Sequence, residues 1–95
     1  MSTPSISVCI LSYNYGRFLG QAIDSALNQM PGDYRRAEVV VVDDGSTDNS
    51  LDVCAQYGER IRVVTCEHRG FADTLTEAIK QAEGDWVALL DVARR

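Results

Sequence analysis

The sequence lacks several features, and each lack excludes a class of protein. No apolar run approaches the length that spans a membrane, and the opening MSTPSIS has neither the charged nor the apolar region of a signal peptide. Only 9 Lys and Arg stand against 14 Asp and Glu, a formal net charge of -5, and the basic residues are scattered. We therefore expect no transmembrane segment and no nucleic-acid partner, since phosphate contacts need clustered Lys and Arg.

Cysteine is also scarce. Cys9, Cys54 and Cys66 are an odd number, so intramolecular disulfides cannot use them all, and no CxxC motif or Cys/His cluster suggests zinc. Cys9 and Cys66 fall in strand-like apolar runs and are expected to be small buried hydrophobic residues. A reducing, cytoplasmic compartment fits this pattern. For a longer protein, the cytoplasmic face of a membrane is the alternative location.

The apolar residues that are present predict one domain over residues 1–95, with strands and helices in alternation. Strands are expected at 6–11, 39–42, 61–66 and 86–90. Helices are expected from 14–16 to 31–33, from 46–48 to 58, and from 71 to 84. The continuous valine run at 39–42 is typical of a strand buried on both faces. The fold class is therefore α/β: three α/β/α layers around a parallel, Rossmann-like sheet of about four strands.

Ligands in such folds bind at the carboxyl ends of the strands, where the strand order reverses. Residues 12–14, 43–44, 67–70 and Asp91 fall at these ends. No GxGxxG motif follows the first strand, so a classical dinucleotide-binding domain is disfavoured. His68 is the only histidine, and we expect it to be a solvated side chain of the third loop.

Asp43 and Asp44 are the most distinctive pair. Two adjacent carboxylates at the end of a buried strand are costly unless each finds hydrogen-bond donors or a cation. One hypothesis is that both cap the turn and the next helix. The other is that one carboxylate accepts a hydrogen bond from a ligand N–H, such as that of a uracil ring, while the other orders the turn.

Three stretches, SISVCILSYNYGRFLGQAIDSALNQ, VVVVDDGSTDNSL and GDWVALLD, together resemble the opening of family 2 glycosyltransferases, which have the GT-A fold. The resemblance implies transfer of a hexose, with inversion, from a nucleoside-diphosphate sugar to an acceptor hydroxyl, the nucleotide being UDP. It places Tyr13 against the base or ribose, Asp44 on the uracil-type edge and Asp43 in support of the turn. The nucleotide-binding residues that it implies are Leu11, Ser12, Tyr13, Asn14, Asp43, Asp44, Gly45 and Ser46.

The sequence departs from the family pattern at the metal. Family members carry an Asp-x-Asp motif for Mg²⁺ or Mn²⁺ after the fourth strand, and here Asp91 matches its first carboxylate while Ala93 replaces the second. One carboxylate is a weak site for a hard cation, so metal binding is expected to be incomplete. Leu75 and Thr76 stand where the family favours Arg-Asn. Thr76 departs from that pattern.

The resemblance also places the general base and the acceptor-binding half downstream. We therefore expect residues 1–95 to be the donor-binding part of a truncated domain, with no catalytic residue of its own and no activity alone. A sheet edge left uncovered would favour self-association.

Two other functions remain open at this point. A receiver domain would use Asp43, Asp44 and Asp91 as an acidic Mg²⁺ pocket, with Asp91 as phosphoacceptor. However, the acidic strand of a receiver is its first, and here a strand and a helix come before it. The other possibility is a non-catalytic nucleotide-binding module.

Overall fold

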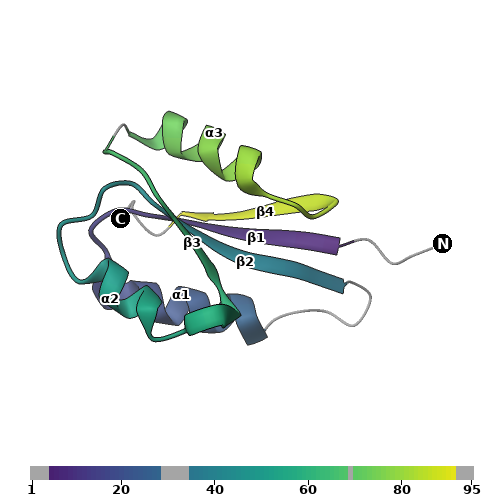
Figure 1. Cartoon of the computed structure of the whole chain (residues 1–95), viewed down its shortest axis with the longest axis horizontal. Helices are drawn as coiled ribbons and strands as arrows, with labels where there is room; N and C mark the ends of the chain where they lie inside the picture. The colour runs from purple at the N-terminus through teal and green to yellow at the C-terminus, as the bar shows by residue number, and fades with distance from the viewer. Residues whose placement is uncertain (1–4, 29–34, 69, 92–95) are drawn as a thin grey trace.

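The computed structural model of the chain describes residues 5–28, 35–68 and 70–91 and has the expected alternation of strands and helices (Figure 1). Its strands are β1 (Ser5–Ser12), β2 (Arg35–Asp43), β3 (Arg62–Thr65) and β4 (Trp86–Asp91). Its helices are α1 (Gly16–Asn28), α2 (Ser50–Ala55), the 3-10 turn η1 (Gly58–Arg60) and α3 (Phe71–Gln81). All strand pairs are parallel, in the order β3-β2-β1-β4. The predicted α/β fold class is confirmed.

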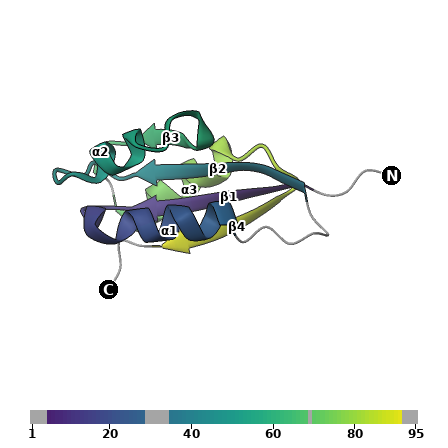
Figure 2. The ribbon, with the colours of Figure 1, turned by 90° about the horizontal axis from the view of Figure 1, so that it is seen from below.

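Helices cover both faces of the sheet, α1 and α2 on one and α3 on the other (Figures 1 and 2). The valine run explains how both faces are filled. Val39 and Val41 pack into the cluster under α1 and α2, while Val40 and Val42 pack into the cluster under α3. None of the four is more than 1% exposed. Successive side chains of a strand point to opposite faces, so only a continuous apolar run can supply both clusters.

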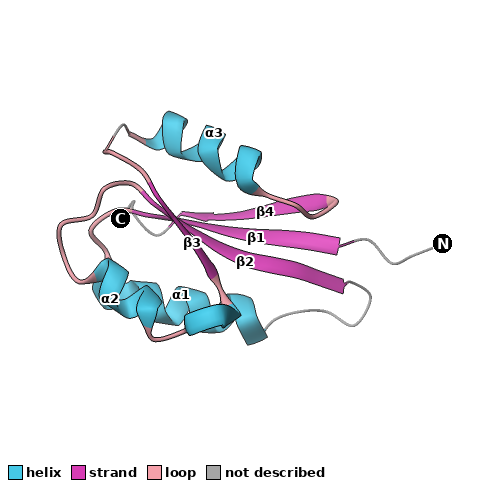
Figure 3. Ribbon diagram, in the orientation of Figure 1, coloured by secondary structure: helices cyan, strands magenta, loops and turns pink. Residues whose placement is uncertain are grey.

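The strand order creates a switch point between β1 and β4. From β1 the chain moves outward through β2 to β3, and α3 then returns it to the other side of β1. Crossovers of one hand that run in opposite directions place their helices on opposite faces, as observed. The loops after β1, β2 and β3 gather at one end of the sheet (Figure 3). Ligand sites of α/β sheets form at this end.

Some element boundaries differ from the sequence-based expectation. The second helix begins at Ser50, because residues 44–49 form a loop that is hydrogen-bonded to the loop after β1. The expectation that Cys66 is a buried strand residue was wrong. Strand β3 ends at Thr65, and Cys66 lies just beyond it, half-buried against the core cluster under α3, with its N–H donating to the carbonyl of Asp43. Cys9 is fully buried, as expected.

A hydrogen-bonded cluster of polar side chains, centred on Glu38, lies at the opposite end of the sheet. Glu38 on β2 accepts hydrogen bonds from Arg62, from the Ser7 hydroxyl and from the Glu83 N–H. Ser7 Oγ in turn accepts from the Gly84 N–H at 2.7 Å. These bonds tie the α3–β4 turn to β1, β2 and β3, and so fix where β4 enters the sheet.

Strand β4 is one of the two edge strands of the described sheet, with β3 at the other edge. Among the described residues it pairs only with β1, and its large apolar side chains remain open to solvent: Trp86 is 63% exposed and Leu89 44%. Within the described ranges, no helix is both long and apolar enough to span a bilayer.

Candidate functional site

The loops after β1 and β2 are bound to each other through Asn14. Its side-chain Oδ1 accepts hydrogen bonds from the N–H groups of Thr47 at 2.7 Å and Asp48 at 3.2 Å. Its own N–H donates to the hydroxyl of Ser46 at 2.8 Å. Asn14 has a φ of 52°, a left-handed conformation that Asn tolerates better than most residues. The SYN and DDGSTD motifs therefore form one hydrogen-bonded unit.

Asp43 orders the turn after β2. It is 1% exposed, and its two oxygens accept from the N–H and the hydroxyl of Ser46, at 2.9 and 2.6 Å. Of the two hypotheses for the acidic pair, the turn-ordering role thus describes Asp43. Asp48 continues the same pattern by accepting from the N–H groups of Gly16 and Ser50. Burial opposes ionisation of Asp48, but these bonds outweigh it and hold its pKa below the ordinary value of 3.8.

Asp44 faces a different set of partners, drawn from the loop after β3. The carboxylate is 7% exposed, and its Oδ2 accepts from the Gly70 N–H at 3.1 Å and lies 3.0 Å from His68 Nδ1. The His68 ring stacks on Tyr13, with ring centroids 4.1 Å apart and an interplanar angle of 13°. Tyr13, Asp44 and His68 therefore meet from three separate loops. We expected His68 to be solvated, and no sequence pattern signalled this pairing.

Gly45 allows the second and third loops to approach closely. Its φ is 75°, and a Cβ at this position would lie 2.7 Å from the backbone nitrogen of His68 and 3.2 Å from the carbonyl oxygen of Cys66. A side chain would push the third loop away from Asp44. The glycine of DDGSTD is therefore needed for the contact between Asp44 and His68.

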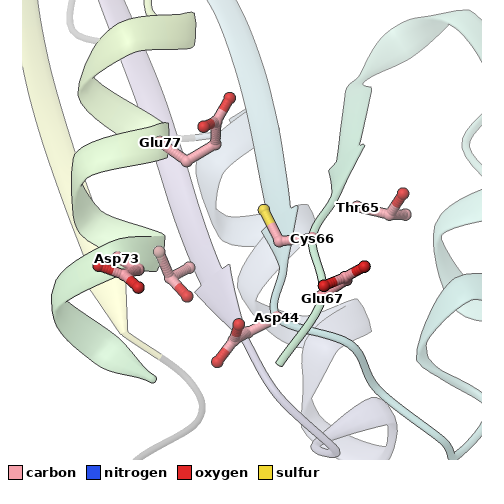
Figure 4. Close-up of a pocket in the computed structure, with 7 residues that line it drawn as sticks. Asp44, Thr65, Cys66, Glu67, Asp73 and Glu77 are labelled. Carbon is pink, nitrogen blue, oxygen red and sulfur yellow. The ribbon is translucent and has the colours of Figure 1, made fainter. Parts of the chain in front are cut away.

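A cavity of about 310 Å³ opens beside this cluster, between the strand ends and α3. In Figure 4, Asp73 and Glu77 lie on α3, while Asp44 and Glu67 lie on the sheet side. The seven lining residues are Asp44, Thr65, Cys66, Glu67, Asp73, Thr74 and Glu77, four of them acidic and none basic. Such walls repel phosphate and suit a group that donates hydrogen bonds.

Leu11 and Ser12 are buried at the carboxyl end of β1, below the loops of the site. Leu11 is 2% exposed and packs in the core with Val40 and Val42, so its contribution to a site is to hold β1 in place. The Ser12 carbonyl accepts from the Asp44 N–H at 2.9 Å, which positions Asp44. Among the described residues, the Ser12 hydroxyl has no hydrogen-bond partner.

The expected metal position lies at the end of β4. The backbone of Asp91 pairs with Leu11, which places it at the switch point. Ala93 and the rest of 92–95 lie outside the described residues. Among the side chains that the structure describes, no three His, Cys, Asp or Glu are grouped so that they would hold a metal ion.

Residues 7–92 match the model of the family described as Glycosyl transferase family 2. The chain belongs to this family. A similar sequence is an uncharacterized glycosyltransferase of Nostoc sp. (strain PCC 7120), which is 42% identical over 90 residues. That match covers 90% of the chain but 27% of the relative, so the chain spans about a quarter of the relative's length.

Solved structures of glycosyltransferases share the fold. A mannosyltransferase from Pyrobaculum calidifontis, in complex with GDP-Man and Mn²⁺, superposes with a TM-score of 0.80 and 28% identity, covering 96% of this chain and 28% of that one. Glucosyl-3-phosphoglycerate synthase from Mycobacterium tuberculosis, in complex with Mn²⁺, UDP and glucosyl-3-phosphoglycerate, has a TM-score of 0.77 and 27% identity. The match covers 93% of this chain and 33% of the synthase.

Membership of a glycosyltransferase family removes the receiver alternative. The structure is consistent with this, because both carboxylate oxygens of Asp43 accept hydrogen bonds from Ser46. An acidic Mg²⁺ pocket would need both members of the pair to face the cation.

Proposed function

We propose that these residues bind the nucleotide of a UDP-linked sugar donor at the carboxyl end of the sheet. In this role the chain contributes donor recognition to the transfer of a hexose to an acceptor hydroxyl, with inversion. The observation that supports the proposal is that Asp44 and Tyr13 both contact His68. A nearly buried carboxylate and an aromatic ring thus meet on one side chain at the carboxyl end of the sheet, where ligands of α/β folds bind.

The chemistry of a uracil ring fits this pairing. Its N3–H is a hydrogen-bond donor, and a shielded carboxylate is a strong acceptor that discriminates against rings without such a donor. Its flat face can stack on Tyr13. Because the neighbouring cavity is acidic, the diphosphate is expected to extend away from it, toward the switch point between β1 and β4.

We also propose that the 95 residues bind the donor without transferring its sugar. The proposal is supported by the incomplete metal motif at Ala93 and by the share of the relatives' length that the chain spans. An assay with a range of sugar nucleotides and acceptors is expected to show no turnover, and turnover would refute this part of the proposal.

Calorimetric titration with UDP tests the binding site. Asp44→Asn removes the charged acceptor, and the affinity for UDP is expected to fall by about tenfold or more, as for a hydrogen bond to a charged group. Asp52→Asn makes the same change on an exposed part of α2, and its affinity is expected to equal that of the wild type. Equal affinities for wild type and Asp44→Asn would refute the site.

We further propose that the β4 edge favours self-association. The strand offers an unpaired edge among the described residues, and Trp86 and Leu89 are exposed on opposite faces of it. Light scattering is expected to show a mass that rises with concentration for the wild type but not for Leu89→Lys. A monomeric mass for the wild type at high concentration would contradict this.

A further inference from the structure

The His68 side chain makes the same kinds of contact that the proposed function assigns to the nucleobase. It is a flat nitrogen heterocycle, it stacks on Tyr13, and one of its ring nitrogens lies 3.0 Å from Asp44 Oδ2. The same nitrogen is 3.2 Å from the Asp44 carbonyl. The imidazole, held by this chain's own third loop, thus occupies the contacts that the proposed function assigns to the base.

A base cannot share these contacts with His68. Ring centroids 4.1 Å apart leave no space for another ring on that face of Tyr13. Asp44 Oδ2 already receives the Gly70 N–H as well as the imidazole, and the whole Asp44 side chain is only 7% exposed. A ligand ring that stacks there and donates to this oxygen must displace the imidazole.

The local structure permits that displacement by rotation of one side chain. The His68 backbone lies close against Gly45, and the Gly70 N–H donates a hydrogen bond to Asp44. The His68 side chain itself is 55% exposed, so it can turn into solvent without disturbing the core. Asp44 and Tyr13 would keep their places.

We propose that His68 is an internal competitor for the nucleobase, which lowers the affinity of the site and swings out when the nucleotide binds. The proposal rests on the proposed function, since it needs a base that docks on Tyr13 and Asp44. It assigns His68 a part in setting affinity, and it predicts that loss of the ring strengthens binding. A ligand pays the cost of any competing conformation as a proportional loss of apparent affinity.

Titration of UDP into three variants tests the competition. His68→Ala is expected to bind UDP about three- to tenfold more tightly than the wild type, because the occluded state is lost. His68→Gln keeps a hydrogen-bond donor without an aromatic ring and is expected to lie between them. Gln56→Ala, which truncates an exposed polar side chain at the end of α2, is the control and is expected to be unchanged. Circular dichroism checks that each variant is folded.

The ring signals of His68 in the wild type provide a second readout that needs no variant. Stacking on Tyr13 shifts them upfield, and they are expected to move to solvent-like positions as UDP is added. If UDP binds while these signals stay upfield, or if His68→Ala binds more weakly, the competition is refuted and the proposed function stands. If neither wild type nor His68→Ala binds UDP or GDP, the proposed function itself fails, and the competition fails with it.

Discussion

The side chain of Asn14 accepts a hydrogen bond from the backbone N–H of Thr47 at 2.7 Å, across 33 residues of sequence. This contact joins the loop after β1 to the loop after β2. It places Tyr13, which precedes Asn14, near Asp44, and those two residues carry the proposed site. The SYN and DDGSTD motifs, which resemble those of the family, thus hold each other in place.

Removal of this bridge should cost stability. Asn14→Ala leaves two backbone N–H groups without their acceptor, and the free energy of unfolding is expected to fall by about 1–3 kcal/mol. Asn14→Asp is the matched control, because a carboxylate accepts the same bonds and Asp tolerates the left-handed φ. Urea denaturation measures both. Equal stability of Asn14→Ala and the wild type would show that the bridge contributes nothing.

The hydrogen-bonded cluster around Glu38 should make the stability of the fold depend on pH in the acid range. Burial alone would raise the pKa of Glu38, but the bonds from Arg62, Glu83 and Ser7 hold it below the ordinary value of 4.5. A carboxyl with a lowered folded pKa stabilises the fold fully above its unfolded pKa and loses that contribution as the pH falls through the folded value.

Glu38→Gln tests this dependence. At neutral pH the variant is expected to be less stable than the wild type by about 1–3 kcal/mol, because Arg62 loses its charged partner. The gap between the two proteins should narrow below about pH 4.5 as Glu38 is protonated. Denaturation curves across the acid range measure it, and a gap that does not change with pH would contradict the assignment.

Thiol labelling can report on the cavity. Cys9 and Cys54 are 0% and 3% exposed, and burial raises the pKa of Cys54 to about 11, so both should react slowly. Cys66 is half-buried and lines the cavity. Iodoacetamide is therefore expected to modify Cys66 first, and UDP is expected to slow that modification. Mass spectrometry identifies the labelled residue, and labelling of Cys54 before Cys66 would contradict the structure.

The metal motif can be completed by one substitution. Wild-type affinity for UDP is expected to change little with Mn²⁺, whereas Ala93→Asp supplies the second carboxylate and is expected to gain about tenfold in affinity when Mn²⁺ is present. Ala93→Asn has the same shape without the charge and serves as the control. Strong Mn²⁺ dependence of the wild type would show that Asp91 already suffices.

The fold was predictable because each element carries its own signal. The valine run of β2 fills two core clusters. Leu19 and Ile23 are spaced so that they lie on one face of α1, and both pack into one of these clusters. The boundaries were less predictable. Residues 44–49 form a loop and not the start of a helix, because they are hydrogen-bonded to Asn14. No local pattern reveals a contact between residues that are 33 positions apart.

The site was predictable in part, for a related reason. Residues 12–14 and 43–46 stand out because polar residues follow buried strands. Their separate roles depend on which way each side chain turns: Asp43 toward Ser46, and Asp44 toward the third loop. The contacts of His68 with Asp44 and Tyr13 were not predicted, because they depend on three loops meeting and on the close approach at Gly45.

Chemical-shift mapping of a UDP titration tests the central claim most directly. The account predicts that the largest backbone and side-chain shifts fall on Tyr13, Asp44, Gly45, His68 and Gly70, with little change at Glu38 and Arg62 at the far end of the sheet. If UDP binds and the shifts miss Tyr13 and Asp44, the assigned site is wrong.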